Sequence, residues 1–207
     1  MKRIGVLVSG GGSNLQAIID SIEDGRIEAE IAVVISNKPE VFALERAIRH
    51  GIPAVVIDHR EYSTVFEYTK AIVNSLEKYQ VDLVCLAGFL RILDRTLTET
   101  YPNRVLNIHP ALLPAFGGKG MYGRYVHEAV IASGAKYSGA TVHMVTPETD
   151  VGPILLQAIV EISDTDTPKS LAEKVLKIEH RIYPEAIKLV LEEGISIEGM
   201  RVRRKIH

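Results

Sequence analysis

Two polar side chains that could perform acyl-transfer chemistry stand two positions apart near the middle of the chain. Asn107 and His109 close an apolar run, 104–108, that has the pattern of a short buried strand. Residues two apart on an extended segment leave the same face, so an amide N–H donor and a titratable imidazole would lie side by side. Pro110 ends the strand because it has no N–H to donate. This spacing fits a polar strand end with a turn proline equally well.

A glycine-rich turn near the N-terminus has the composition of an anion site. Residues 9–14, Ser-Gly-Gly-Gly-Ser-Asn, follow the apolar run 4–8 and precede apolar residues at helical spacing. Such a turn presents backbone N–H groups and a helix dipole to a phosphate. Leu15 stands where a dinucleotide fingerprint has its third glycine, and no Gly-Lys-Ser/Thr sequence follows. The turn therefore predicts a site for one phosphate.

Further segments could complete a binding site. Residues 88–93 combine a glycine, large apolar side chains and one arginine, which suits either the wall of a pocket for a flat ligand or a loop packed on the core. Asp150 lies in a turn-rich connection between two predicted strands. Loop 115–127 contains four glycines and is interpreted as a mobile binding loop. His143, on an alternating strand, is interpreted as a structural or surface residue.

The elements that must position these groups alternate between strand and helix. Strands are predicted at 4–8, 31–35, 54–57, 81–87, 104–108, 141–145 and 154–160, with a final hairpin of 195–197 and 200–205. Helices are predicted at about 15–25, 41–50, 64–79, 94–101, 125–133 and 168–192, and Pro184 marks a candidate break in the last one. This order predicts one α/β domain, 1–207, with a mostly parallel Rossmann-like sheet, helices on both faces and antiparallel C-terminal strands.

Composition argues against several classes of protein. A net charge of -2 and a pI near 6.4 disfavour a nucleic-acid surface. No apolar stretch reaches the roughly 18 residues of a membrane helix, and residues 1–3 lead directly into a strand, unlike a signal peptide. No group of His, Cys, Asp and Glu has metal-ligand spacing, so no metal is expected. Cys85 lies in a strand-like run and is interpreted as core. We therefore expect a cytoplasmic protein.

Five motifs together resemble the phosphoribosylglycinamide formyltransferases, folate-dependent enzymes of purine synthesis. They are SGGGSNLQ (9–16), LAGFLRIL (86–93), NIHPALLP (107–114), DVGP (150–153) and EHRIYP (179–184). The third and fourth motifs are shared by a wider set of formyl-tetrahydrofolate enzymes, whereas the first and last narrow the likeness to the glycinamide ribonucleotide branch. The likeness covers essentially the whole chain, and it implies the formyltransferase fold.

The resemblance also implies a reaction and a set of site residues. The formyl group of 10-formyltetrahydrofolate, the co-substrate, would move to the amine of glycinamide ribonucleotide through a tetrahedral intermediate. Asn107 and protonated His109 would stabilise its oxyanion, and Asp150 would raise the pKa of His109. The implied substrate-binding residues are Gly12, Ser13, Asn14, Pro110 and Glu179. The implied folate-binding residues are Leu90, Arg91, Ile92, Leu93, Asn107 and Asp150. The phosphate would bind in an N-terminal half of about 1–100, and the folate and catalytic groups would occupy a C-terminal half of about 101–207.

Some positions depart from the family pattern, and other functions stay open. Val65 stands where the family often has an arginine, with Arg60 as the nearest substitute, and Leu176 replaces a polar residue. A methionyl-tRNA formyltransferase would be expected to carry a C-terminal RNA-binding domain, and a formyltetrahydrofolate hydrolase an N-terminal regulatory one. A non-catalytic module that binds phosphoribosyl ligands is the third alternative. The expected partners are small molecules, with a homodimer left open.

Overall fold

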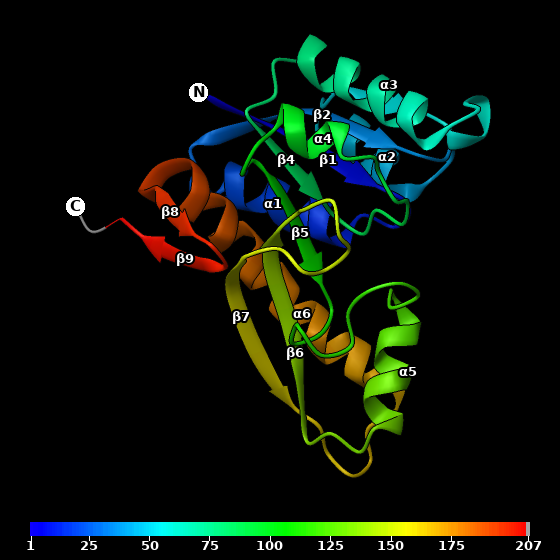
Figure 1. The fold of residues 1–207 in the computed structure, drawn as a ribbon, viewed down its shortest axis with the longest axis vertical. Coiled ribbons are helices and arrows are strands. Elements are labelled where there is room, and N and C mark those ends of the chain that lie inside the picture. Colours follow the sequence, from blue (N-terminus) through cyan, green and yellow to red (C-terminus); the bar gives the residue numbers. More distant parts are fainter. Residues whose placement is uncertain (206–207) are drawn as a thin grey trace. The chain divides into compact units, whose positions relative to one another are not determined.

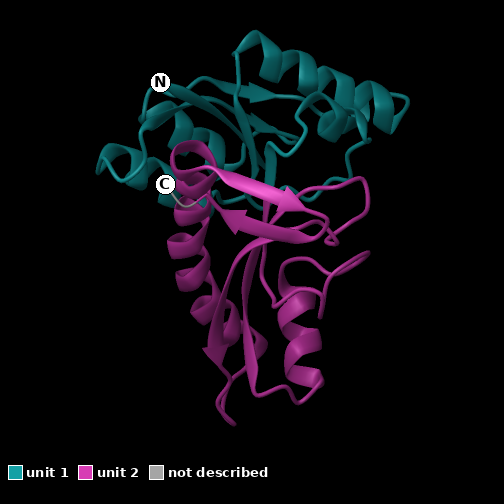
Figure 2. Cartoon of the chain, turned by 60° about the vertical axis from the view of Figure 1, so that its left-hand side comes forward, with its two compact units in different colours: residues 1–106 teal, residues 107–207 magenta. Residues whose placement is uncertain are grey.

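A computed structural model describes residues 1–205 and confirms the predicted α/β class, with strands and helices alternating along the chain. The chain divides into two compact units, 1–106 and 107–207 (Figure 2). The boundary falls within strand β5 (Val105–His109). That all 207 residues act as one formyltransferase domain stays a prediction.

The first unit is built on a parallel sheet. Its strands β1 (Lys2–Val8), β2 (Ala29–Ser36), β3 (Ala54–Val56) and β4 (Leu83–Leu86) follow the order β3-β2-β1-β4. Each neighbouring pair is parallel. Strands β1 and β2 are apolar and buried along most of their length, as parallel strands covered on both faces are. Because β1 and β4 are parallel neighbours, the loops 9–14 and 87–93 leave the same edge of this sheet.

Helices cover this sheet, and a side-chain cap defines the start of one of them. They are α1 (Ser13–Glu23), α2 (Phe42–Arg49), α3 (Val65–Lys78) and α4 (Thr96–Thr100), with a 3₁₀ turn η1 (His59–Glu61) before α3. Helices α1 and α3 lie on opposite sides of β1 and β2 in Figure 1. A capping box starts α3, in which the Thr64 hydroxyl accepts from the Glu67 N–H and the Glu67 carboxylate accepts from the Thr64 N–H.

The second unit combines an antiparallel strand pair with two helices. Strands β6 (Tyr137–Met144) and β7 (Ile154–Glu161) are antiparallel, and β8 (Ile195–Glu198) and β9 (Arg201–Arg204) form the predicted hairpin. Helix α6 (Pro168–Lys188) packs on β6, β7 and α5 (Arg124–Ala132). The candidate break at Pro184 is wrong, because α6 continues to Lys188 and a π turn, η2 (Leu189–Glu193), follows. Within residues 1–205, no helix combines the length and the apolar character needed to cross a membrane.

Candidate active site

Strand β5 places the two residues that the spacing singled out. Val105, Leu106 and Ile108 are buried and anchor the strand, while Asn107 and His109 alternate with them. The His109 side chain is nearly enclosed, with 4% of its surface exposed. The strand ends before Pro110, as predicted. An amide and an imidazole are therefore fixed on one face of a buried strand end.

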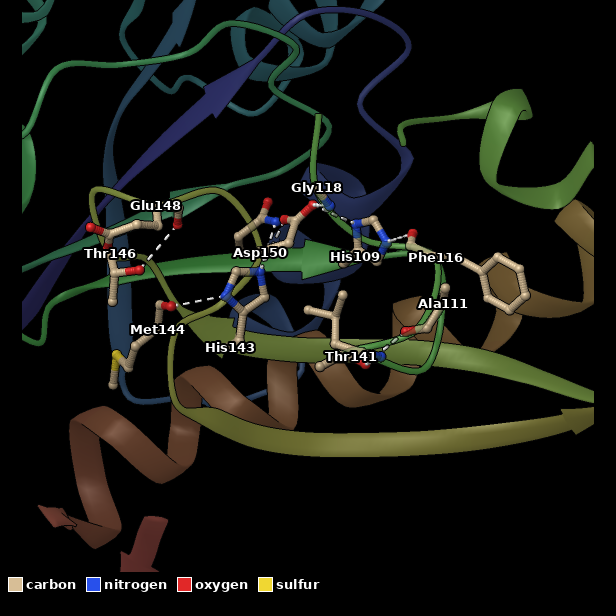
Figure 3. A network of polar contacts seen from close by, with 12 residues as sticks. His109, Ala111, Phe116, Gly118, Thr141, His143, Met144, Thr146, Glu148 and Asp150 are labelled. Carbon is tan, nitrogen blue, oxygen red and sulfur yellow. Dashed lines mark hydrogen bonds and ion pairs between the residues drawn. The ribbon is translucent and has the colours of Figure 1, made fainter. Parts of the chain in front are cut away.

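Asp150 reaches the same place from the connection between β6 and β7. Its carboxylate lies between two imidazoles, with Oδ2 3.6 Å from His109 Nδ1 and Oδ1 3.6 Å from His143 Nε2 (Figure 3). The Asp150 side chain is 10% exposed, so water screens these charges little. The backbone at Asp150 has a φ of 59°, a left-handed conformation that non-glycine residues seldom adopt. The three residues implied by the resemblance thus lie in one cluster.

His143, interpreted as a structural or surface residue, is buried and is a fourth member of this cluster. It is 2% exposed on β6, and its Nε2 lies 3.1 Å from Asn107 Nδ2. Its Nδ1 lies 2.8 Å from the Met144 carbonyl oxygen, which can only accept, so Nδ1 carries a proton. Nε2 is then free to accept an N–H of Asn107. The contact fixes the orientation of the Asn107 amide relative to the His143 ring.

The sequence contained a weak signal for His143. Thr141 and His143 share one face of β6, and both are buried in a strand that is otherwise apolar or small. The Thr141 hydroxyl donates to the Ala111 carbonyl and accepts from the Leu113 N–H, at 2.7 and 3.0 Å. Two polar side chains on one face of a buried strand indicate long-range polar partners. Here those partners belong to β5 and to the segment that follows it.

Loop 115–127 contacts the cluster through its backbone. His109 Nε2 donates to the Phe116 carbonyl oxygen at 2.8 Å, and the Gly118 N–H donates to Asp150 Oδ2 at 2.9 Å (Figure 3). At Gly117 an added Cβ would lie 2.5 Å from a Leu113 methyl carbon and 3.2 Å from the Asp150 Cβ, so a larger residue here would have to displace these side chains. The sequence indicated a binding loop here but gave no sign that its backbone would hold both His109 and Asp150.

The direction of the His109 pKa is the second correction. Burial lowers the pKa of His109 below its ordinary value, although the Asp150 carboxylate and the Phe116 carbonyl both raise it, and His143 lowers it slightly. The expectation from the sequence included only the carboxylate. Burial also raises the pKa of Asp150, but its contacts with His143, Gly118 and His109 outweigh burial and lower it overall. The resting pair is therefore a neutral imidazole beside a carboxylate.

The predicted phosphate residues form the start of α1 in the first unit. Gly12 is the N-cap residue with a φ of 70°, Ser13 opens the helix, and Asn14 is buried. An added Cβ at Gly12 would lie 2.7 Å from the Ala43 Cβ and 2.9 Å from its Cα. Glycine is therefore required at position 12 by both conformation and space.

The predicted folate-binding segment borders a cavity of about 440 Å³ in the first unit. Leu90, Arg91 and Ile92 line one part of it, and Leu93 is not among its lining residues. Val65 and Tyr68 of α3 also line it, together with His59, Tyr62, Ser63 and Thr64. The segment after β4 is thus the wall of a pocket, as one of the two interpretations held.

The remaining predicted positions are accounted for individually. Arg60, the suggested substitute for an arginine at position 65, donates to Asp58 through both Nε and Nη2, at 3.0 and 2.6 Å. It is not a lining residue of the cavity. Glu179 is buried on α6, and Leu176 is half-buried on the same helix. Pro110 is half-buried directly after His109. Among residues 1–205, His, Cys, Asp and Glu side chains form no group of three or more placed to hold a metal ion.

These observations define an α/β protein with an amide, a buried imidazole and a carboxylate arranged as acyl transfer requires. Comparisons with known proteins narrow that class of protein. The formyl transferase family model matches residues 2–187. The structure superposes on glycinamide ribonucleotide transformylase 1 of Symbiobacterium toebii with a TM-score of 0.94 and 46% identity, over 99% of this chain and 94% of that one. The chain belongs to the formyl transferase family, which confirms the resemblance drawn from its motifs.

Curated relatives agree, although some of them are much longer. Phosphoribosylglycinamide formyltransferase, chloroplastic, of Arabidopsis thaliana is 45% identical over 94% of this chain and 67% of the plant protein. The human trifunctional purine biosynthetic protein adenosine-3 is 44% identical over 94% of this chain. This chain spans only 19% of that human protein.

Proposed function

We propose that this chain is a folate-dependent phosphoribosylglycinamide formyltransferase. It would transfer the formyl group of 10-formyltetrahydrofolate to the amine of glycinamide ribonucleotide in purine synthesis. The observation that carries the proposal is the cluster of Asn107, buried His109 and Asp150 in a chain of the formyl transferase family. The identity of 46% with a glycinamide ribonucleotide transformylase over nearly the full length of both chains supports this substrate.

The charge states of the cluster suit the proton movement that this reaction needs. As the amine attacks the formyl carbon, a C–N bond forms and the carbonyl oxygen becomes an oxyanion, to which Asn107 would donate an N–H. The nitrogen becomes positively charged and must lose a proton. Neutral His109 would take that proton, and the Asp150 carboxylate would stabilise the imidazolium that results. The same proton would then go to N10 of the folate as its bond to carbon breaks.

The proposed ligand contacts follow the family pattern. Gly12, Ser13 and Asn14 would hold the phosphate, with Pro110 and Glu179 contacting the rest of the ribonucleotide. The pterin and its tail would lie against Leu90, Arg91, Ile92 and Leu93, with Asn107 and Asp150 beside the pterin. Because Asp58 binds the Arg60 guanidinium, Arg91 is the cation of the cavity wall that we assign to the folate tail. We propose no metal, and we place the reaction in the cytoplasm.

A folate-release assay tests the proposal. Purified protein is mixed with 10-formyltetrahydrofolate, with and without glycinamide ribonucleotide, and the release of tetrahydrofolate and the formation of formylated ribonucleotide are measured. We expect release that depends on the ribonucleotide and equals the product formed. Release without ribonucleotide would replace the transferase by a hydrolase. Binding of both ligands without release would leave a phosphoribosyl-binding module.

A further inference from the structure

Helix α2 holds the glycine-rich turn 9–14, called the glycine loop below, through hydrogen bonds to two consecutive carbonyl groups. The Ala43 N–H donates to the Gly10 carbonyl oxygen at 3.1 Å, and Arg46 Nε donates to the Gly11 carbonyl oxygen at 2.9 Å. In a trans peptide the C=O and the following N–H point in opposite directions. Turning these carbonyls toward α2 therefore turns the N–H groups of Gly11 and Gly12 away from it.

The Arg46 side chain is fixed at both ends of its guanidinium group. While Nε contacts the loop, Nη1 donates to Gln16 Oε1 at 2.9 Å, and the group lies 4.5 Å from the centre of the Phe42 ring. Gln16 is on the first turn of α1, where its own N–H donates to the Gly12 carbonyl. Arg46 thus joins α2, the loop and the start of α1. A lysine could make one of these contacts but not the planar pair.

From this arrangement we propose that Arg46 is a positioning residue for binding of the ribonucleotide phosphate, holding the 10–13 backbone in the shape that presents its N–H groups. The inference rests on the proposed function, since it assumes that the phosphate binds at this loop. The Arg46 charge also favours an anion there. Losing a hydrogen bond from a charged group should weaken phosphate binding about tenfold.

Arg49 provides a matched control on the same helix. It lies one turn further along α2, its guanidinium is 5.3 Å from the same Phe42 ring, and it pairs with Glu45 at 3.3 Å. The two arginines therefore share helix, charge and aromatic partner. What distinguishes Arg46 is its contact with the loop and with Gln16. Comparing Arg46→Ala with Arg49→Ala isolates that contact.

The test measures phosphate affinity and steady-state kinetics for wild type, Arg46→Ala, Arg46→Lys and Arg49→Ala, with thermal unfolding of each free protein. Inorganic phosphate is the probe, as a competitor of glycinamide ribonucleotide and in calorimetry. For Arg46→Ala we expect about tenfold weaker phosphate binding and a KM for the ribonucleotide raised to the same extent. The kcat and the folate KM should stay within about twofold. The phosphate affinity and ribonucleotide KM of Arg46→Lys should lie between those of Arg46→Ala and wild type. Those of Arg49→Ala should match wild type.

The outcomes separate this inference from the proposed function. If the wild type transfers formyl groups and Arg46→Ala keeps its phosphate affinity and ribonucleotide KM, the role of Arg46 is wrong while the function stands. An equal loss in kcat, both KM values and thermal stability would reduce Arg46 to a structural residue. If the wild type binds phosphate in an Arg46-dependent way but transfers no formyl group, the function fails and the role of Arg46 remains. Absence of phosphate binding by the wild type would overturn the inference.

Discussion

The glycine-rich turn 9–14 of the first unit and the polar cluster of the second are held in place by different kinds of contact. The turn would bind phosphate through its backbone, and its shape depends on a left-handed Gly12 and on the carbonyl contacts with α2. The cluster consists of side chains brought from β5, from β6 and from the connection after β6. Backbone sites tolerate changes of side chain but not of conformation, whereas side-chain clusters fail when one partner is lost. A change of side chain should therefore harm the polar cluster more, and a change of backbone conformation should harm the glycine loop more.

The largest effect is expected in the polar cluster. His109→Ala removes the base that would accept the proton of the attacking amine, and kcat should fall about 10²- to 10⁴-fold. The ribonucleotide KM should change little, because the turn proposed to bind the phosphate is untouched. Steady-state kinetics with both substrates check this, alongside circular dichroism to confirm folding.

His127 on α5 is the matched control for that substitution. It is also a buried histidine, its Nδ1 has no hydrogen-bond partner among the described residues, and burial lowers its pKa as well. His127→Ala should retain turnover within about threefold, since no proton transfer is assigned to it. Equal losses in both variants would mean that His109 matters for packing rather than for chemistry.

His143→Leu should have the next largest effect. It keeps an apolar side chain on β6 but removes the acceptor that orients the Asn107 amide and the donor to the Met144 carbonyl. A misdirected amide would stabilise the oxyanion poorly, so kcat should fall about 10- to 100-fold. His143→Gln, which can again offer an acceptor to Asn107, should recover part of the lost kcat. Kinetics indistinguishable from wild type in His143→Leu would show that Asn107 needs no such support.

Substitutions in the glycine loop should weaken binding of the ribonucleotide rather than lower kcat. Gly12→Ala adds a Cβ against the Ala43 backbone at a φ of 70°, whereas at Gly11 an added Cβ meets nothing within 4 Å. Backbone strain of about 1–3 kcal/mol should raise the ribonucleotide KM roughly tenfold or more in Gly12→Ala. Gly11→Ala should remain near wild type. Calorimetric titration with the ribonucleotide checks both variants, and equal affinities would remove the argument from space and conformation.

The sequence predicted the glycine loop better than the polar cluster, because the loop is a local feature and the cluster depends on distant contacts. The alternation of apolar strand and helix patterns predicted the elements and the sheet, and the spacing of the glycines predicted the loop, because these signals are local. The contact of His143 with Asn107 was not predicted because the two residues are 36 positions apart. The Phe116 carbonyl on His109 left no trace in the sequence, since any residue supplies a carbonyl. The pKa of His109 was predicted in the wrong direction because burial depends on how distant segments pack.

The smallest effect is expected for Asp150→Asn, which tests how burial and the carboxylate charge together set the pKa of His109. In the wild type the Asp150 carboxylate raises the pKa of His109 against the stronger lowering by burial. Asp150→Asn removes the negative charge but keeps the burial, so the pKa of His109 should move further below the ordinary value of 6.5. At any pH in the titration range, a smaller fraction of His109 would then be charged. An NMR titration of the His109 imidazole in the free protein measures this directly, with exposed Asp164→Asn as the control that should leave it unchanged. A His109 pKa that stays in place or rises in Asp150→Asn would mean that the carboxylate, 3.6 Å away, does not govern the charge of the imidazole, and the proton would need another stabilising partner.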